Sequence, residues 1–392
     1  MITTPTTSVH PSTTIDLSPS DHSPGDLVSW AAELGIVLAE HAARNDEQGA
    51  WVSDSYRHLV DAGALALAVP SELGGLGAPV AGVARFVREL ARHCGSTALA
   101  MAMHQHATLA LAWRYRRGQP GAEAALRGIV DARTVLATAG GSDFTSPSGS
   151  ATAVDGGYRV SGRKRFVSQS VAATVLSALF PLGLDGDRQV ISVTIPMDDP
   201  GLTIEPTWNA MGMRGTASNE VTIDDVFVPE DRVGPLRPYG VLDPPLQLVG
   251  IFALPVIAAV YLGIAESAHA AAVERASGAG DVLTQRSVGV MAIKLRVAGW
   301  ALDGALAVIG DDPDPSMEIF AAAVAAKHHV ATTGIEVCDL AMEVVGGAAF
   351  ARGCVIERAY RDVRAAKFHP LTPDLALLHA GRLALGVPCD EL

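Results

Sequence analysis

The sequence has little that would point to a disulfide framework, a metal site or a membrane span. Its four cysteines are scattered, with no CxxC pair and no metal-ligand spacing: Cys94, Cys338, Cys354 and Cys389. We therefore expect buried or free thiols in a reducing cytosol, and no metal. No stretch reaches the roughly 18 unbroken apolar residues of a membrane helix, so no membrane partner is expected.

Positive charge is also scarce. The 392 residues include 29 lysines and arginines against 42 aspartates and glutamates, a net charge of −13. This balance excludes a nucleic-acid partner, which would need a basic face. Residues 1–25 are rich in Ser, Thr and Pro and lack the basic start and apolar run of a signal peptide. They are predicted to form a disordered tail on a cytoplasmic protein.

Hydrophobic residues are plentiful at 49%, against 18% charged residues, which predicts a large folded core. Residues 26–133 place apolar side chains at three- and four-residue spacing, which predicts an N-terminal α-helical domain. Within it, Ser53 is predicted to cap a helix that Gly63 closes. Residues 236–392 contain about four long helices, typical of a C-terminal four-helix bundle whose apolar faces favour oligomerisation.

Residues 134–235 differ from the helical parts in composition and in the length of their apolar segments. Short segments rich in Val, Ile and Thr are separated by Gly, Asp and Pro, which predicts an antiparallel sheet, either a small barrel or a sandwich. Asp155 and Gly156 predict a tight hairpin turn. The predicted fold is therefore mainly α with a β domain: a helical bundle, a middle β-barrel and a second helical bundle.

Two histidines interrupt an otherwise apolar helix, STALAMAMHQHATLALAWRYRRG. A helix that is apolar all round is buried, so His104 and His106 are either satisfied core histidines or groups that line a cavity. Two positions apart on a helix means about 200° of rotation. The two rings therefore cannot both face one ligand.

The stretch from Met342 to Leu385 combines a Gly-Gly turn with a charged helix. Gly346 and Gly347 would let the backbone approach a ligand closely, because neither carries a Cβ atom. The charges on the following helix are Glu357, Arg358, Arg361, Asp362 and Arg364. The simplest interpretation is a set of ion pairs at helix-face spacing. Arg214 is likewise interpreted as a structural anchor between domains.

Five ordered segments, from about residue 26 to 385, resemble the acyl-CoA dehydrogenase superfamily of flavoproteins. They are VPSELGGLG, TAGGSD, GGYRVSGRKRFVSQS, MGMRGTASNEVTIDDVFVP, and the pair EVVGGAAF and ERAYRDVRAAKF. The resemblance implies an FAD cofactor and a homotetramer. In character the chain is closest to the superfamily's two-component flavin monooxygenases, such as the N-hydroxylases and dibenzothiophene monooxygenases.

The resemblance also implies roles for particular residues. Phe166 falls where the family stacks an aromatic ring beside the isoalloxazine, and Ser168 where it donates a hydroxyl to the flavin rim. Gly141 and Ser142 fall where the family contacts the flavin or the diphosphate end of the substrate.

The Gly-Gly turn has an implied role as well. Glu343, Gly346 and Gly347 fall where the family receives the dinucleotide part of the flavin, usually from a neighbouring subunit. Close backbone N–H groups suit a diphosphate.

The chain departs from the family at the catalytic base. Both positions where the family carries its glutamate lack a carboxylate: one is Pro370, in FHPLT, and the other is Ala253, in GIFALP. A positioned general base contributes about 10²- to 10⁴-fold in rate. The family's Arg-x-x-Phe-Gly segment is also replaced, by ASGAGDV at residues 276–282, so looser flavin binding is expected.

Three functions are compatible with this pattern. The favoured one is a two-component monooxygenase that takes reduced FAD or FMN from a separate reductase. It would use O₂ to hydroxylate a small amine or apolar substrate through a flavin C4a-hydroperoxide. His369 and His104 or His106 stand where such enzymes keep histidines, and a histidine that titrates near neutrality suits proton transfer.

The alternative is an FAD-dependent dehydrogenase of acyl-CoA or acyl-carrier-protein substrates with a displaced base, for which His369 is the candidate. The third function is a flavin-binding scaffold without catalysis.

Overall fold

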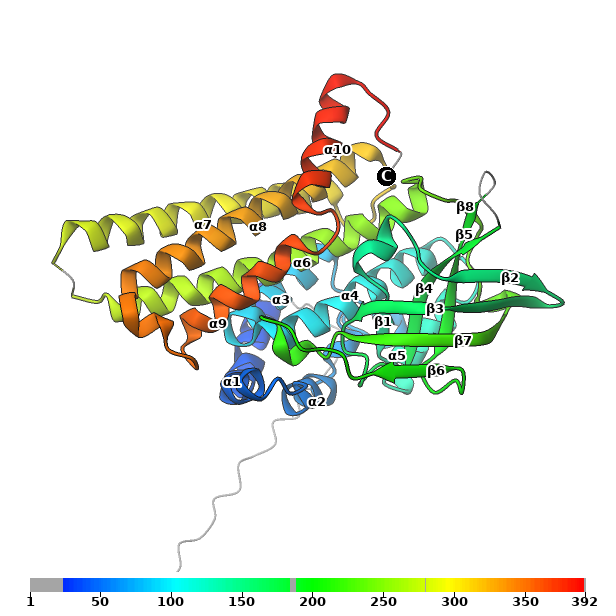
Figure 1. Ribbon diagram of the computed structural model, residues 1–392, viewed down its shortest axis with the longest axis horizontal. Helices are drawn as coiled ribbons and strands as arrows, with labels where there is room; N and C mark the ends of the chain where they lie inside the picture. The colour runs from blue at the N-terminus through cyan, green and yellow to red at the C-terminus, as the bar shows by residue number, and fades with distance from the viewer. Residues whose placement is uncertain (1–23, 184–187, 279, 391–392) are drawn as a thin grey trace, which may run out of the picture.

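Helices flank a central sheet on both sides in sequence (Figure 1). The computed structural model describes residues 24–183, 188–278 and 280–390. The predicted tail lies outside the described residues except for Pro24 and Gly25, which instead begin the first helix.

The N-terminal part is helical, as predicted. Its helices are α1 (Pro24–Gln48), α2 (Ser53–Asp61), α3 (Val80–His93), α4 (Gly95–Arg116) and α5 (Ala122–Asp131). Gly63 follows α2 at a left-handed φ of 83° and closes it as expected. The predicted cap is wrong by one residue: Val52 holds the N-cap position, and Ser53 is the first helical residue, with no side-chain cap bond.

The middle part is one eight-stranded sheet in the order β6-β7-β3-β2-β4-β5-β8, with β1 attached to β4. Val154 pairs with Gly157, so the predicted hairpin at Asp155–Gly156 is confirmed. The sheet is not purely antiparallel, because β1 runs parallel to β4. The strands are β1 (Leu136–Thr138), β2 (Ser150–Val154), β3 (Gly157–Val167), β4 (Val175–Leu182), β5 (Gln189–Pro196), β6 (Leu202–Glu205), β7 (Asn219–Pro229) and β8 (Arg237–Pro238).

The C-terminal part has three long helices and two short ones. They are α6 (Pro244–Arg275), α7 (Val282–Ile309), α8 (Met317–Val345), α9 (Val355–Asp362) and α10 (Pro373–Leu385). The 3₁₀ turn η7 (Val363–Lys367) and the FHPLT segment separate α9 from α10. Prolines at 370 and 373 cannot continue a helix interior, which explains the break.

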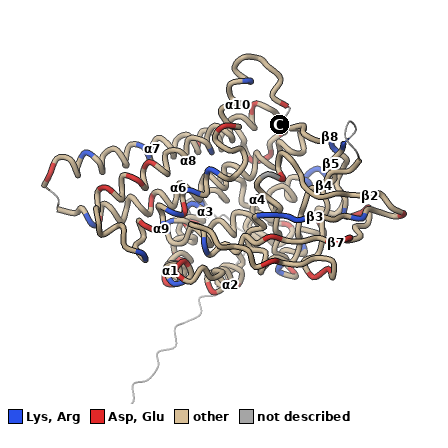
Figure 2. Tube along the Cα trace, viewed as in Figure 1, with Lys and Arg blue, Asp and Glu red and all other residues tan. Residues whose placement is uncertain are grey.

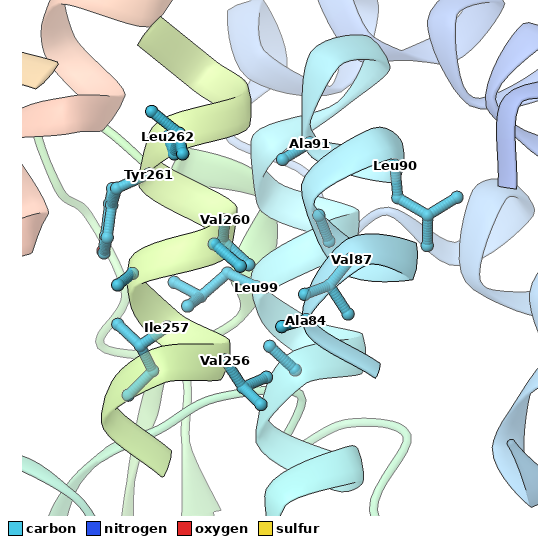
Figure 3. Close-up of a cluster of buried hydrophobic side chains, with 14 of the residues drawn as sticks. Ala84, Val87, Leu90, Ala91, Leu99, Val256, Ile257, Val260, Tyr261 and Leu262 are labelled. Carbon is cyan, nitrogen blue, oxygen red and sulfur yellow. The ribbon is translucent and has the colours of Figure 1, made fainter. Parts of the chain in front are cut away.

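The two helical parts share one hydrophobic core around α6, while the sheet has its own. Figure 3 shows Val87 of α3 and Leu99 of α4 beside Val256 and Val260 of α6, with Tyr261 pointing to the other side of α6. By length and composition α6 could cross a membrane, but 94% of its most apolar window is buried inside the protein. We therefore assign α6 as the central core helix.

Charged residues of both signs are interspersed over the helices and the sheet (Figure 2). The ion-pair interpretation is confirmed for Arg361, which contacts Asp46 of α1 at 2.6 Å and Glu357 at 2.5 Å. Arg364 pairs with Asp339. Arg214 donates from Nε to the Asp46 carbonyl at 2.7 Å, so it anchors the sheet domain to α1 as expected.

Gly263 in α6 provides a test of the core. A Cβ atom there would lie 2.1 Å from the Arg88 carbonyl oxygen of α3. We predict that Gly263→Ala costs about 1–3 kcal/mol of stability through overpacking. A Cβ atom at Gly381 in α10 would meet nothing within 4 Å, so Gly381→Ala should keep or raise the melting temperature. Equal melting temperatures for the two variants would contradict this packing.

Candidate functional site

An outward-facing aromatic ring marks one face of the site. Phe166 lies near the end of β3 at a left-handed φ of 58°, and 53% of it is exposed. This conformation is rare for a bulky residue and is typical of strained positions at ligand sites. The neighbouring Val167 and Ser168 are buried. The Trp208 ring meets Phe166 edge-on, with 6.3 Å between ring centroids, so it supports the aromatic side chain from one side.

Glycine allows the turn after β1 to approach this ring. Gly141 has a φ of 64°, and a Cβ atom there would lie 3.2 Å from Cδ2 of Phe166. Ser142 belongs to the same 3₁₀ turn, η3 (Gly141–Phe144). The structure therefore brings together the Gly-Ser turn and the aromatic residue that the sequence predicted for flavin binding. A side chain at Gly141 would crowd the Phe166 ring.

The Ser168 hydroxyl belongs to an internal chain of hydroxyl groups. Its Oγ lies 2.8 Å from Ser218 Oγ, which lies 2.7 Å from Thr216 Oγ1. Thr216 Oγ1 donates to the Met213 carbonyl at 3.0 Å. The role of Ser168 toward a flavin therefore stays a prediction.

A buried ion pair that the sequence pattern did not indicate fixes the Gly-Ser turn. Lys164 of β3 donates to Asp143 at 2.6 Å, and both side chains are buried. The lysine also donates to the carbonyls of Ser148 and Leu179, at 2.8 and 2.5 Å. Burial lowers the pKa of Lys164, although Asp143 opposes that shift. The pair ties the turn that contains Gly141 to the middle of β3.

His104 has a structural position. Its Nε2 lies 3.0 Å from the Leu65 carbonyl, and its Nδ1 accepts the Leu136 N–H at 3.1 Å. Burial lowers its pKa to about 4. Both ring nitrogens are occupied, so His104 joins α4 to β1, and its candidacy as a catalytic group is corrected. In the sequence, the position of His104 on an otherwise apolar helix already indicated a buried, structural histidine.

His106 faces a different direction from His104, as the helix geometry predicted. Its Nδ1 donates to the Ala102 carbonyl at 3.2 Å, and burial lowers its pKa to about 4. In neutral imidazole the other nitrogen, Nε2, is then an acceptor. Repulsion from a charged His106 also contributes to lowering the pKa of His369, so the two rings share one region.

His369 lies in the FHPLT segment between α8 and α6. Its ring is 5.7 Å from that of Tyr261, and the ammonium of Lys327 donates to its carbonyl at 2.8 Å. Burial lowers its pKa to about 3, helped by the charges of Lys327 and His106. The expectation of a histidine that titrates near neutrality is therefore wrong. At pH 7 the rings of His104, His106 and His369 are all neutral.

The Gly-Gly turn lies elsewhere in the chain. Glu343, Gly346 and Gly347 are exposed where α8 ends. Figure 1 places the end of α8, beside α9, across the molecule from the sheet. Within one chain the structure therefore does not bring these residues to Phe166.

The two glutamate positions are confirmed to be empty of carboxylates: Ala253 is half-buried in α6, and Pro370 follows His369. The buried carboxylate nearest in sequence is Asp362. Burial raises its pKa to about 6, and it accepts the Met213 N–H at 2.5 Å. Asp362 thus joins α9 to the sheet domain through this hydrogen bond. Among the described residues it forms no ion pair with an arginine, although its helix-face spacing suggested one.

The three parts of the chain, helical, sheet and helical, each match a domain of the same family. Models of the N-terminal, middle and C-terminal domains of acyl-CoA dehydrogenase match residues 32–115, 137–226 and 250–369. YdbM of Bacillus subtilis (strain 168), named as a candidate acyl-CoA dehydrogenase, is 32% identical over 375 residues, covering 89% of this chain and 94% of YdbM. The chain belongs to the acyl-CoA dehydrogenase family.

Other relatives are oxygenases by name. Isobutylamine N-hydroxylase of Streptomyces viridifaciens is 29% identical over 355 residues, covering 88% of this chain and 90% of that protein. The solved structure of KijD3 in complex with FMN and dTDP-3-amino-2,3,6-trideoxy-4-keto-3-methyl-D-glucose matches with a TM-score of 0.85 and 26% identity, covering 95% and 97% of the two chains. The predicted resemblance to the monooxygenase branch is confirmed.

The buried histidines predict acid sensitivity. A histidine whose folded pKa lies below the unfolded value of about 6.5 stabilises the protein fully above pH 6.5, and the stabilisation is lost as pH falls towards the folded pKa. For His104 that window runs from 6.5 down to about 4. We predict that the melting temperature of the wild type falls steeply over this window.

His104→Gln separates the titration from the hydrogen bonds. At pH 7 it should cost about 1–3 kcal/mol, because the Leu136 N–H loses its acceptor. Between pH 6.5 and 4 its melting temperature should fall less than that of the wild type. Parallel curves for the two proteins would contradict the assignment of His104.

Proposed function

We propose that the protein is the oxygenase component of a two-component flavin-dependent monooxygenase. It would take reduced flavin from a separate reductase, and O₂, and hydroxylate a small organic substrate, with an amine as the favoured class. The observation that carries this proposal is the combination of a retained flavin face at Phe166 with glutamate positions that hold Pro370 and Ala253. The N-hydroxylase and KijD3 relatives support it.

The residues of this chain fit a flat aromatic cofactor. The Phe166 ring is held outward, and the absence of a Cβ atom at Gly141 leaves room beside it. FMN is favoured over FAD, because the KijD3 complex contains FMN. Bound reduced flavin would supply the two electrons with which one oxygen atom of O₂ enters the substrate and the other leaves as water.

The histidines of this chain would move the protons. Nε2 of neutral His106 is an acceptor, and the ring of neutral His369 offers one donor and one acceptor. An amine gives up a proton when it becomes a hydroxylamine, and the departing oxygen atom needs protons to form water. A histidine with a lowered pKa passes on a proton as soon as it has received one. His106 is buried, which keeps bulk water away from its part of this exchange.

The dehydrogenase alternative has one observation in its favour, the 32% identity to YdbM. It would require His369 to remove a proton from carbon. An imidazole whose pKa is lowered to about 3 is a weak base for that step. The monooxygenase therefore explains the site better.

A homotetramer is part of the proposal. Helix α7 exposes Ile293, Val297 and Trp300 at three- and four-residue spacing, and Trp300 is 65% exposed. A contiguous apolar stripe of this kind is typical of a surface that another protein covers. Self-association would also allow a neighbouring chain to bring Glu343, Gly346 and Gly347 to the flavin, as the family resemblance implies.

Turnover measurements test the roles of the histidines. With reduced FMN, ¹⁸O₂ and a panel of small amines, the wild type should form a product that contains one ¹⁸O atom. We predict that His369→Ala and His106→Ala lower the rate about 10²-fold or more, because each removes a proton carrier. His329→Ala, an exposed histidine on α8, is the matched control and should leave the rate unchanged.

Size-exclusion chromatography must show that all variants keep the assembly of the wild type. Unlabelled product, or full activity in His369→Ala, would overturn the proposed chemistry.

A further inference from the structure

A cavity of about 280 Å³ lies beside the FHPLT segment, between α8 and the chain that leads into α10. Its walls come from α8, η7 and the start of α10. It shares no lining residue with the Phe166 face, α4 or α6. Its lining includes Pro373 at the start of α10 and five polar side chains: Lys327, His328, Thr332, Glu336 and Lys367.

Lys327 gives this cavity its chemical character. The side chain is buried, with 3% exposed, and Nζ donates to the carbonyls of His369 and Leu371 at 2.8 Å each. An ammonium has three N–H donors, so one donor is left over. Among the described residues, neither an acceptor for the third N–H nor a carboxylate partner is present.

An ammonium without a counterion is unusual inside a protein. Buried charges are normally paired, because an isolated one loses its hydration without compensation. Burial lowers the pKa of Lys327 to about 8, so it is still mostly charged at pH 7. An unbalanced positive charge in the wall of a cavity favours a negatively charged occupant.

The other polar groups around the cavity are consistent with an anion. Lys367 adds a second positive charge, and Thr332 adds a hydroxyl donor. Glu336 is the one acidic side chain among the lining residues described. Its Oε2 lies 2.5 Å from Nζ of Lys294, which offsets part of its negative charge. The net charge that faces the cavity is therefore positive.

We propose that this cavity is a binding site for a small oxyanion, a phosphate or carboxylate group, with Lys327 as its principal charge partner. The site is separate from the flavin face, and the inference does not depend on the proposed function. Because Lys327 also holds the carbonyls on either side of Pro370, an anion here would share its ammonium with the segment that carries His369. Occupancy of the cavity is thereby linked to the position of that histidine.

Calorimetric titration of inorganic phosphate into the full-length, flavin-free protein tests the proposal. Chloride at matched ionic strength is the control for general salt effects. We expect one phosphate per chain. Lys327→Met should weaken binding about 10-fold to 100-fold, the usual effect of losing a hydrogen bond to a charged group.

Because Lys327 is buried and its variant can fail to fold, two exposed positions test the site independently. Thr332→Val should weaken phosphate binding several-fold. Glu336→Gln should strengthen it about 2-fold to 5-fold, because a negative charge at the rim is removed. Glu318→Gln, at the exposed start of the same helix, is the matched control and should bind like the wild type.

A repeat titration with saturating FMN checks the location. Unchanged phosphate affinity supports a separate site. Phosphate that is displaced by FMN, no binding by the wild type at millimolar phosphate, or equal affinities for Thr332→Val, Glu336→Gln and the wild type would each overturn the proposal.

Discussion

The docking of the sheet domain onto the helices through Arg361 is the interaction that holds the site together. Its guanidinium pairs with Asp46 of α1 and Glu357 of α9, and it donates to the Met211 carbonyl at 3.0 Å. Next to it, Asp362 accepts the Met213 N–H. Water screens such a partly buried network less than it screens an exposed ion pair. This joint sets the sheet domain, and with it the Phe166 face, against the helical part of the chain that contains His106 and His369.

The order of helices and strands could be predicted from local sequence patterns, whereas the aromatic ring beside the glycine turn was implied by the family resemblance. The role of His104 could not, because its two partners, Leu65 and Leu136, are more than 30 residues away along the chain. The lowered pKa of His369 was likewise hidden, since it arises mainly from burial. The contact of Ser168 with Ser218 and, through it, Thr216 could not be predicted either, because it forms only when β3 and β7 pair in the folded sheet.

Neutral histidines in place of a glutamate change what the family's architecture can do. A carboxylate beside the flavin suits the removal of a proton from carbon. Two neutral imidazoles, held by burial and by the Lys327 contact to the His369 carbonyl, suit the exchange of protons with oxygen and nitrogen. If the face at Phe166 and Gly141 holds the flavin, as proposed, it can serve either reaction. The proposed change of reaction therefore rests on the acid–base groups.

Use of oxygen as a substrate is what separates this site from that of an acyl-CoA dehydrogenase. The decisive measurement loads the protein anaerobically with reduced FMN, mixes it rapidly with O₂ and follows the flavin absorbance. We expect a transient species whose spectrum is neither that of reduced nor that of oxidised flavin and whose decay is slower than the reoxidation of free reduced FMN. Immediate reoxidation, together with bleaching of the oxidised flavin by an acyl thioester, would show that the site is a dehydrogenase instead.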